Sequence, residues 1–518
     1  MTSRLRAACG AALFLALAWP AQAQQVAQDA TPAVTPTRLE AALPQLDAMA
    51  ARAVAEGQVP GLALVVVHRD KVVFLKGYGR REAGKPGVVD ADTVFQLASF
   101  SKPISATVVA ALVGEKVLDW DSTVASLDPS FQLMGAYPSQ QVSVRDLFAH
   151  RSGLPGEAGN ELEALGFERE AILHRLRLVP PSSSFRAGYS YSNFGLTAGA
   201  VAAAAPTGKS WEEVAQEKLY APLGMASTSS RHADFITHEN RAALHIGGPG
   251  HWAATLARQP DAQAPAGGVS STVRDLAQWM RLELANGMFD GRRLIPEAAL
   301  EATHQPLMTR GANPVTGAPS FYGLGWVVEF GRHGVSWGHA GAFSVGARTL
   351  VTLYPEAELG IVVLTNAFPT GVPEGLAAQF FDLAFDGTPE KDWMGPWNAA
   401  YAGMFAPAME AARARFAPRA DALPAAPLAA YEGRYANDYV GVAEVASVGA
   451  GLELRLGPEG KARFPLTHFN RDIFLYYPTP ETPDVPSAAS FTLGAEGVAG
   501  ALTLEDFGPS GLGRLERE

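Results

Sequence analysis

The chain has 518 residues, which is too long for one ordinary hydrophobic core, so two domains are expected. Hydrophobic residues make up 47% of the chain and charged residues 18%, a composition that is typical of globular proteins and argues against a fully disordered chain. The net charge is −11, and no run of Lys and Arg is long enough to follow a phosphate backbone, so nucleic-acid binding is not expected.

The first residues have the pattern of a cleavable signal peptide. Two arginines precede an apolar run from Ala7 to Trp19, and Ala21-Gln22-Ala23 supplies the small residues of a cleavage site. The apolar run is too short to span a bilayer as a permanent helix, and a buried N-terminal helix is the alternative. We therefore expect a signal peptide over residues 1–23, cleavage after Ala23, and a periplasmic or secreted protein without an integral membrane segment.

The single cysteine, Cys9, lies inside this segment. After cleavage the mature protein would have no cysteine, and therefore no disulfide, thiolate zinc site or cysteine nucleophile. The eleven histidines include no His-Glu-x-x-His spacing, so neither a metal nor another cofactor is expected.

The elements expected after a loose leader over residues 24–37 place strands at both ends of a first domain, residues 38–394, with helices between them. In chain order they are a helix from Thr37 to about Glu56, a hairpin over Gly61–Tyr78, a mostly helical region from Ser99 to about Met280, and strands from Tyr322 onward that include a second hairpin over Ala347–Thr365. This order predicts one sheet built from the two ends of the domain, with an inserted helical region.

A second domain is expected at the C-terminus. Ala and Pro are frequent over residues 395–428, which predicts a linker. Over residues 429–518 apolar and polar residues alternate, as in the run Leu452–Leu456. The pattern predicts a separate all-β domain of about ninety residues.

Ser99 and Lys102 are the candidate catalytic pair. In a helix, residues three apart share a face, and a serine in the first turn lies at the positive end of the helix dipole, which favours a developing alkoxide. Burial lowers the pKa of a lysine, so a neutral Lys102 could accept the serine proton. A capping serine followed by a surface lysine gives the same spacing. This chain has one Ser-x-x-Lys motif, and apolar residues continue the helix behind it, which favours the catalytic interpretation.

Tyr191 and Asn193 form a second candidate group. A tyrosine phenol beside a lysine can relay protons, and an asparagine amide can hold both the lysine and a substrate carbonyl. The alternative is a turn with a buried tyrosine. The same spacing recurs at Tyr435 and Asn437 in the β domain, where a turn is expected.

His339-Ala340-Gly341, just before the late strands, is the third candidate group. The backbone amides of Ala342 and Ser99 would supply the two donors of an oxyanion hole. His245-Ile246-Gly247 is a rival match, in a loop that no strand follows.

In this order, the three groups resemble the three motifs of the serine β-lactamase and penicillin-binding superfamily. The form that the three motifs take in this chain resembles the class C branch of the superfamily. This branch includes D-aminopeptidases and esterases and is grouped as peptidase family S12. Residues 147–155 and 265–272 resemble further segments of that branch, and the resemblance covers roughly Leu39 to Asp386. It implies the α/β fold of that superfamily, an antiparallel sheet with an inserted helical region.

The resemblance also implies an acyl-enzyme mechanism. Ser99 would attack a carbonyl, Lys102 and Tyr191 would move protons, and water would release the acyl group; whether Lys102 or Tyr191 is the acylation base stays open. The residues that would bind substrate and form the oxyanion hole are Asn193, His339, Gly341 and Ala342.

One departure from the family pattern bears on the substrate. Many members have Lys-Thr-Gly as the third motif, and here His339 replaces the lysine. A histidine is mostly neutral near pH 7 and would hold a substrate carboxylate less firmly, which favours a peptidase or esterase over an efficient β-lactamase. Asn366, after the last strand, either touches the substrate or forms a strand-end turn.

The C-terminal region resembles the lipocalin-like domain that is appended to some S12 peptidases, most clearly at Tyr431–Tyr435. We expect an all-β barrel there. Such a domain could restrict substrate entry, support a homo-oligomer, or be purely structural, and the sequence leaves these alternatives open.

Two further motifs are interpreted as chance matches. The run Gly334–Gly338 fits the nucleophile elbow of α/β-hydrolases, but a strand is expected after Ser336, where that fold needs a helix. Gly208-Lys209-Ser210 lacks the leading glycine of a phosphate loop.

The sequence therefore predicts an exported serine hydrolase that acts on small peptide, amide or ester substrates. The preferred substrates are peptides with D- or unusual residues, such as cell-wall fragments or opened cyclic peptides. The alternatives are a carboxylesterase, a weak β-lactamase, and a penicillin-binding or sensor module that turns over slowly.

Overall fold

The computed structural model describes residues 34–479, 485–508 and 511–518. The predicted signal peptide, its cleavage site and Cys9 lie outside the described residues. Among the residues that are described, no helix combines the length and the apolar character needed to cross a membrane.

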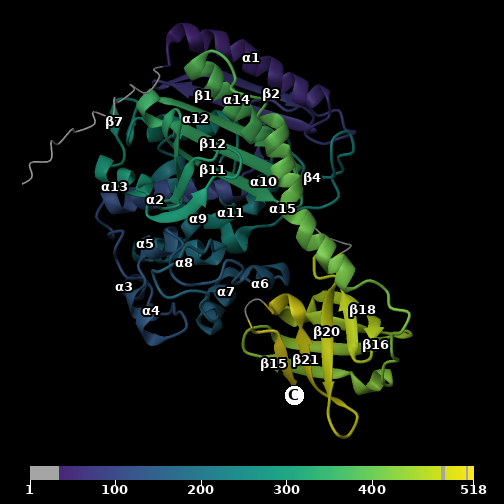
Figure 1. The fold of residues 1–518 in the computed structure, drawn as a ribbon. Helices are drawn as coiled ribbons and strands as arrows, with labels where there is room; N and C mark the ends of the chain where they lie inside the picture. The colour runs from purple at the N-terminus through teal and green to yellow at the C-terminus, as the bar shows by residue number, and fades with distance from the viewer. Residues whose placement is uncertain (1–33, 480–484, 509–510) are drawn as a thin grey trace, which may run out of the picture.

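An eight-stranded antiparallel sheet is the frame of the first domain (Figure 1). The strand order is β2-β1-β13-β12-β11-β10-β9-β8, so the N-terminal hairpin pairs directly with the late strands. The predicted closure of one sheet by the two ends of the domain is confirmed. The strands are β1 (Gly61–His68), β2 (Lys71–Gly79), β8 (Met308–Ala312), β9 (Pro319–Tyr322), β10 (Val327–Gly331), β11 (Gly334–Phe343), β12 (Ala347–Tyr354) and β13 (Leu359–Thr365).

Helices cover both faces of this sheet. On one face lie α1 (Pro36–Ala55) and α14 (Val372–Asp386), and on the other lie α2 (Ser101–Gly114) and α12 (Val273–Leu284). Strand β1 is buried at every position, because its alternate side chains enter different cores. Leu62, Leu64 and Val66 join the core of α1 and α14, whereas Ala63, Val65 and Val67 join the core of α2 and α12.

The inserted region between β2 and β8 is mostly helical, as expected. Its central helix is α8 (Asn193–Ala204), which is apolar on nearly every side and packs against α2, α5 and α11. Its other helices are α3 (Val124–Leu127), α4 (Ala136–Gln141), α5 (Val144–Phe148), α6 (Asn160–Ala164), α7 (Arg169–Arg175), α9 (Trp211–Ala215), α10 (His232–Thr237), α11 (Ala264–Gly267) and α13 (Glu297–Glu301). Short strands complete it: β3 (Phe95–Gln96), β4 (His245–Ile246), β5 (Ser270–Ser271), β6 (Met288–Phe289) and β7 (Arg292–Arg293), while β14 (Ala367–Phe368), after β13, pairs with β4.

The C-terminal domain is a closed eight-stranded barrel, which confirms the all-β prediction. Leu452, Leu454 and Leu456 fill its interior, and Glu453 and Arg455 between them point outward. Its strands are β15 (Gly433–Asn437), β16 (Gly441–Val448), β17 (Gly451–Leu456), β18 (Ala462–Asn470), β19 (Ile473–Tyr476), β20 (Ser487–Leu493), β21 (Ala499–Leu504) and β22 (Arg514–Arg517).

Helix α15 (Met394–Arg415) runs from the sheet to the barrel and makes up much of the segment expected as a linker (Figure 1). Near its start, Tyr401 donates a hydrogen bond to Glu374 at 2.9 Å, and Arg348 is ion-paired with the same buried carboxylate. The helix is therefore fastened to the first domain before it reaches the second.

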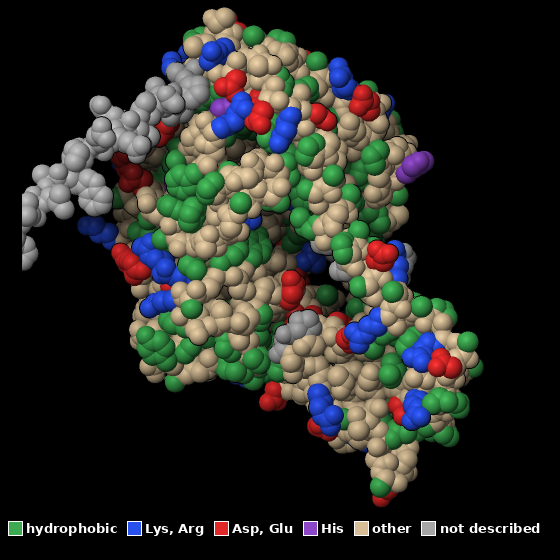
Figure 2. All heavy atoms as spheres, viewed as in Figure 1, with side chains coloured by type: hydrophobic (Ala, Val, Ile, Leu, Met, Phe, Trp, Pro, Cys, Tyr) green, Lys and Arg blue, Asp and Glu red, His purple; other side chains and the backbone are tan. Residues whose placement is uncertain are grey.

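The barrel also contacts the inserted helical region. Tyr439, in the turn between β15 and β16, is buried, and its hydroxyl accepts a hydrogen bond from the Gly159 amide at 3.1 Å and donates one to Glu161 at 2.7 Å. Leu162 and Ile172 belong to the same apolar cluster as the barrel core. On the face drawn in Figure 2, positive and negative side chains are interspersed, so this face has no extended basic surface.

Candidate active site

Ser99 lies in a short 3-10 turn, η1 (Ala98–Phe100), that leads directly into α2. The residue before it, Ala98, has φ +50°, a left-handed conformation that costs a non-glycine residue about 1–2 kcal/mol. Three side-chain hydrogen bonds hold this turn in place: Ser101 Oγ to the Ala98 carbonyl (2.7 Å), the Val269 amide to Ser101 Oγ (3.0 Å), and Thr349 Oγ1 to the Leu97 carbonyl (2.7 Å).

Lys102 is fully buried beside Ser99, with its Nζ 3.0 Å from Ser99 Oγ. The amine donates hydrogen bonds to Asn193 Oδ1 at 2.8 Å and to the Ala266 carbonyl at 2.9 Å, and no carboxylate among the described residues pairs with it. Burial holds the pKa of Lys102 well below its ordinary value. In the neutral amine both protons are used by these two acceptors, so the lone pair faces the Ser99 hydroxyl.

Tyr191 lies against the same lysine. Its ring centre is 4.5 Å from Lys102 Nζ. Burial raises the pKa of Tyr191 above its ordinary value, and a hydrogen bond with Ser99 acts in the opposite direction. Tyr191 is therefore a protonated phenol in contact with both members of the candidate pair.

Asn193 is the first residue of α8, and the start of this helix is fixed by Ser192. The Ser192 hydroxyl accepts a hydrogen bond from the Gly195 amide at 3.1 Å, which caps the helix. The Asn193 Oδ1 atom faces Lys102, and its Nδ2 lies 3.5 Å from Asn160 Oδ1, at the start of α6. The structure thus brings Ser99, Lys102, Tyr191 and Asn193 together.

His339 adjoins this group from β11, but both of its ring nitrogens are already used. Nδ1 donates to the Ala340 carbonyl at 2.7 Å, so Nε2 is the atom that accepts the Tyr322 hydroxyl at 2.9 Å. Burial holds the pKa of His339 well below its ordinary value. The ring is therefore neutral and has no free donor for a substrate carboxylate.

Gly341 and Ala342 lie where β11 passes the nucleophile turn. The pairing of β10 with β11 ends at Gly338, so the rest of β11 has β12 on one side and η1 on the other. An ideal Cβ on Gly341 would lie 2.1 Å from the Leu97 carbonyl oxygen, so only glycine allows this approach. The role of the Ala342 amide in an oxyanion hole stays a prediction.

Four residues to which the motifs gave no role border the same space: His150, Tyr189, Arg310 and Tyr322. The His150 ring centre is 4.6 Å from that of Tyr191 and 4.8 Å from that of Tyr322. Its Nδ1 accepts a hydrogen bond from the Ser192 amide at 3.1 Å. The family-like segment over residues 147–155 contains His150, and this was the available signal. Arg310 and Tyr322 have no local motif.

Asn366 has a structural role that agrees with the strand-end interpretation. Its amide donates to the carbonyls of Arg80 and Arg81, at 3.2 and 3.0 Å. His245, from the rival match to the third motif, also has a structural role, because its Nδ1 is hydrogen-bonded to the Asn366 carbonyl at 2.8 Å.

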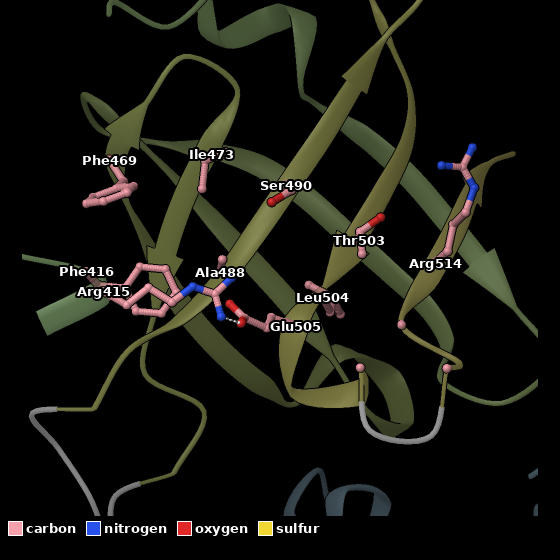
Figure 3. A pocket seen from close by; sticks show the side chains of 13 residues that line it. Arg415, Phe416, Phe469, Ile473, Ala488, Ser490, Thr503, Leu504, Glu505 and Arg514 are labelled. Atoms are coloured by element: carbon pink, nitrogen blue, oxygen red, sulfur yellow. Dashed lines mark hydrogen bonds and ion pairs between the residues drawn. The ribbon is translucent and has the colours of Figure 1, made fainter. Parts of the chain in front are cut away.

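Neither the group of possible metal ligands in the described residues nor the pocket beside the barrel lies at Ser99. His333, Asp382 and Asp386 bring donor atoms within 4.8 Å of one another, but Arg332 is ion-paired with both carboxylates, so a positive charge already occupies that position. A pocket of about 480 Å³ lies on the outer face of the barrel beside the end of α15 (Figure 3). Its charged lining includes the ion pair of Arg415 with Glu505.

Residues 46–384 match the family model described as "Beta-lactamase". The chain belongs to the β-lactamase family. Residues 417–512, most of which form the barrel, match a second model, described as a domain of unknown function, DUF3471.

Relatives of this β-lactamase-family chain include hydrolases and penicillin-binding proteins. Unguisins hydrolase ungD' of Aspergillus campestris is 25% identical over 410 residues, which cover 74% of this chain and 72% of that protein. Penicillin-binding protein 4 of Amycolatopsis lactamdurans is 28% identical over 343 residues, which cover 64% of this chain and 85% of that protein.

The fold is shared with the octameric penicillin-binding protein homologue from Pyrococcus abyssi. The TM-score is 0.56 at 20% identity, and the match covers 89% of this chain and 98% of that chain. The likeness therefore extends over both domains.

Proposed function

We propose that this protein is an exported serine hydrolase in which Ser99 forms an acyl-enzyme with small peptides that contain D- or unusual residues. The observation that carries the proposal is the buried Lys102, whose Nζ lies 3.0 Å from Ser99 Oγ without a carboxylate partner among the described residues. A buried, unpaired amine is costly for a fold, and a base for the serine proton is the function that explains it. The names of the two relatives, a hydrolase and a penicillin-binding protein, also support it.

In the acylation step, Lys102 accepts the hydroxyl proton while Ser99 Oγ bonds to the substrate carbonyl carbon. The carbonyl electron pair moves to oxygen, where the backbone amides of Ser99 and Ala342 would stabilise it. The carbon–nitrogen or carbon–oxygen bond then breaks, and the leaving group takes its proton from the Lys102 ammonium through the Tyr191 hydroxyl. A water molecule, deprotonated by the same route, attacks the ester and regenerates Ser99.

Lys102, rather than Tyr191, is the acylation base in this proposal. The environment lowers the pKa of the lysine and raises that of the tyrosine, so the amine gives up its proton more readily than the phenol does. Tyr191 then acts as a proton carrier between the lysine and the leaving group.

His339 favours a peptidase or esterase over an efficient β-lactamase. A neutral ring with both nitrogens occupied offers no charge to a carboxylate next to the reacting bond. The second candidate, a penicillin-binding module that turns over slowly, has the same acylation chemistry and differs in the lifetime of the Ser99 adduct.

A substrate panel on the purified protein tests the proposal, with Ser99→Ala as the control. The panel contains p-nitrophenyl esters, D- and L-aminoacyl amides, small peptides and a chromogenic cephalosporin. We expect Ser99→Ala to abolish hydrolysis and labelling by an active-serine probe, and full activity in that variant would refute the proposal. Mass spectrometry of the Ser99 adduct separates the two candidates, because an adduct that persists for hours indicates the slow-turnover module.

Export and self-association are parts of the same proposal. N-terminal sequencing of the mature protein from a native host tests export, and a start at Gln24 is expected. The structural neighbour is octameric by its description, and light scattering of the full chain tests whether this protein also forms a homo-oligomer.

A further inference from the structure

Helix α6 lies on the side of the helical region that faces the barrel, and the barrel residue Tyr439 contacts its start (Figure 1). The Tyr439 hydroxyl accepts a hydrogen bond from the Gly159 amide at 3.1 Å and donates one to Glu161 Oε1 at 2.7 Å. These two partners are the residues immediately before and after Asn160. The barrel therefore holds the chain on both sides of Asn160.

The chain at Gly159 is also packed tightly against the first turn of α8. Gly159 is buried and has φ +87°, and an ideal Cβ at this position would lie 2.8 Å from a ring carbon of Phe194. Glycine is the residue that adopts this conformation at so short a distance. Phe194 directly follows Asn193, so the segment that Tyr439 holds lies against the turn that carries a candidate site residue.

Two asparagine amides connect α6 to the candidate base. Asn160 Nδ2 donates a hydrogen bond to Glu157 Oε2 at 2.9 Å, so Asn160 Oδ1 is the atom that faces Asn193. Asn193 Nδ2 donates to that oxygen at 3.5 Å, which leaves Asn193 Oδ1 to accept from Lys102 Nζ at 2.8 Å. An amide has its donor and its acceptor on opposite sides, so each contact in this chain fixes the orientation of the next group.

The orientation of Asn193 decides where the lone pair of a neutral Lys102 points. Such an amine has two protons, and the oxygens of Asn193 and Ala266 accept both. If the Asn193 amide turned over, its NH₂ group would donate to the lone pair and compete with the Ser99 hydroxyl, whose Oγ lies 3.0 Å from Nζ. The contact with Asn160 opposes this turn.

We propose that Tyr439 is a positioning residue for the reaction at Ser99, an inference that rests on the proposed hydrolase function. The Tyr439 hydroxyl holds the start of α6, α6 holds Asn160 in place, and Asn160 keeps Asn193 Oδ1 directed at Lys102. The barrel then supports the active site of its own chain. Loss of the Tyr439 hydroxyl leaves the base present but less well oriented, so the rate falls while substrate binding is retained.

The test compares two buried tyrosines of the barrel whose hydroxyls make the same pair of hydrogen bonds. The Tyr431 hydroxyl accepts from the Ala426 amide at 2.8 Å and donates to Asp472 at 2.7 Å, so both of its partners belong to the C-terminal part of the chain. Tyr439→Phe and the matched control Tyr431→Phe each remove one hydroxyl and should lower the urea midpoint alike. A difference in activity between them therefore reports the contact with α6.

Saturation kinetics of p-nitrophenyl acetate hydrolysis by the full-length protein give kcat and KM, and circular dichroism establishes that each variant is folded in the assay. We expect Tyr439→Phe to lower kcat about 10-fold, the fold-change that corresponds to one hydrogen bond, with KM within about twofold. Tyr431→Phe should keep both constants within about twofold of the wild type. Asn160→Ala should lower kcat as Tyr439→Phe does, and the double variant should be no slower than the slower single variant, because both changes act through the same amide.

Three results overturn the inference and leave the proposed function standing. They are equal kcat values for Tyr439→Phe and Tyr431→Phe, a wild-type kcat for Asn160→Ala, and effects that multiply in the double variant. Asn160→Ala keeps every barrel contact that Tyr439 makes, so its result decides the question even where Tyr439→Phe does not fold. Absence of Ser99-dependent ester hydrolysis in the wild type overturns both the inference and the proposed function.

Discussion

Replacing Gly341 with alanine tests how closely the third motif holds the turn that carries Ser99. An ideal Cβ at this position would lie 2.1 Å from the Leu97 carbonyl oxygen, 2.4 Å from Thr349 Oγ1 and 2.9 Å from the Phe100 amide nitrogen. Carbon contacts are normally about 3.5 Å or longer, so β11 and η1 would have to separate by roughly 1 Å. Two of the three atoms are backbone atoms on either side of Ser99, and therefore the separation displaces the nucleophile.

The structure gives the size of the expected effect. A displacement of about 1 Å at a reacting group costs on the order of 100-fold in rate, and overpacking costs about 1–3 kcal/mol of stability. We expect Gly341→Ala to lower kcat/KM for a Ser99-dependent ester by about 100-fold and the free energy of unfolding by about 1–3 kcal/mol.

Ester hydrolysis and urea unfolding measure the two effects. Gly500→Ala is the control, because an ideal Cβ at that position of β21 meets no atom within 4 Å. It should leave both measurements unchanged. A Gly341→Ala protein with wild-type activity and stability would refute the assignment of this glycine to the support of Ser99.

Two more predictions follow from buried polar groups. Lys102→Met should abolish hydrolysis yet raise the free energy of unfolding at neutral pH, because the lysine binds a proton more tightly in the unfolded chain than when it is buried. This gain in stability should vanish as the pH rises towards 10.5, the ordinary pKa of lysine, and urea titrations at a series of pH values measure it. Stabilisation that does not depend on pH would contradict this. Tyr439→Phe should destabilise the protein by about 1–3 kcal/mol, since the Gly159 amide and Glu161 lose a buried partner. Wild-type unfolding would refute a role for that contact.

The pairing of Ser99 with Lys102 is predictable from the sequence, because it depends on local geometry. Residues three apart near a helix start lie on one face, and the apolar residues that follow predict burial. The start of α1 was less predictable: Thr37 was the expected cap, but Thr35 caps a helix that begins at Pro36. Both positions have a threonine, and only the backbone decides which one accepts the hydrogen bond.

Arg310 and Tyr322 could not be assigned from the sequence for a different reason. A single arginine or tyrosine has no spacing that distinguishes a site residue from a core or surface residue. Arg310 reaches the site face through a shift of register in β8, and Tyr322 reaches His339 across the sheet. These placements depend on strand pairing, which the local pattern does not specify.

The lowered pKa of Lys102 is likewise a product of the whole fold. Its partners come from three distant segments: Ser99 before α2, Asn193 at the start of α8, and the Ala266 carbonyl in α11. No one of these segments buries the amine alone, and none supplies a negative charge. The sequence names a lysine that could be a base, but only the assembly of the helical region against α2 removes it from water, and that removal lowers its pKa. Substitutions that loosen the contact of α8 with α2 should therefore raise the pH at which Ser99 becomes active, without touching either catalytic side chain.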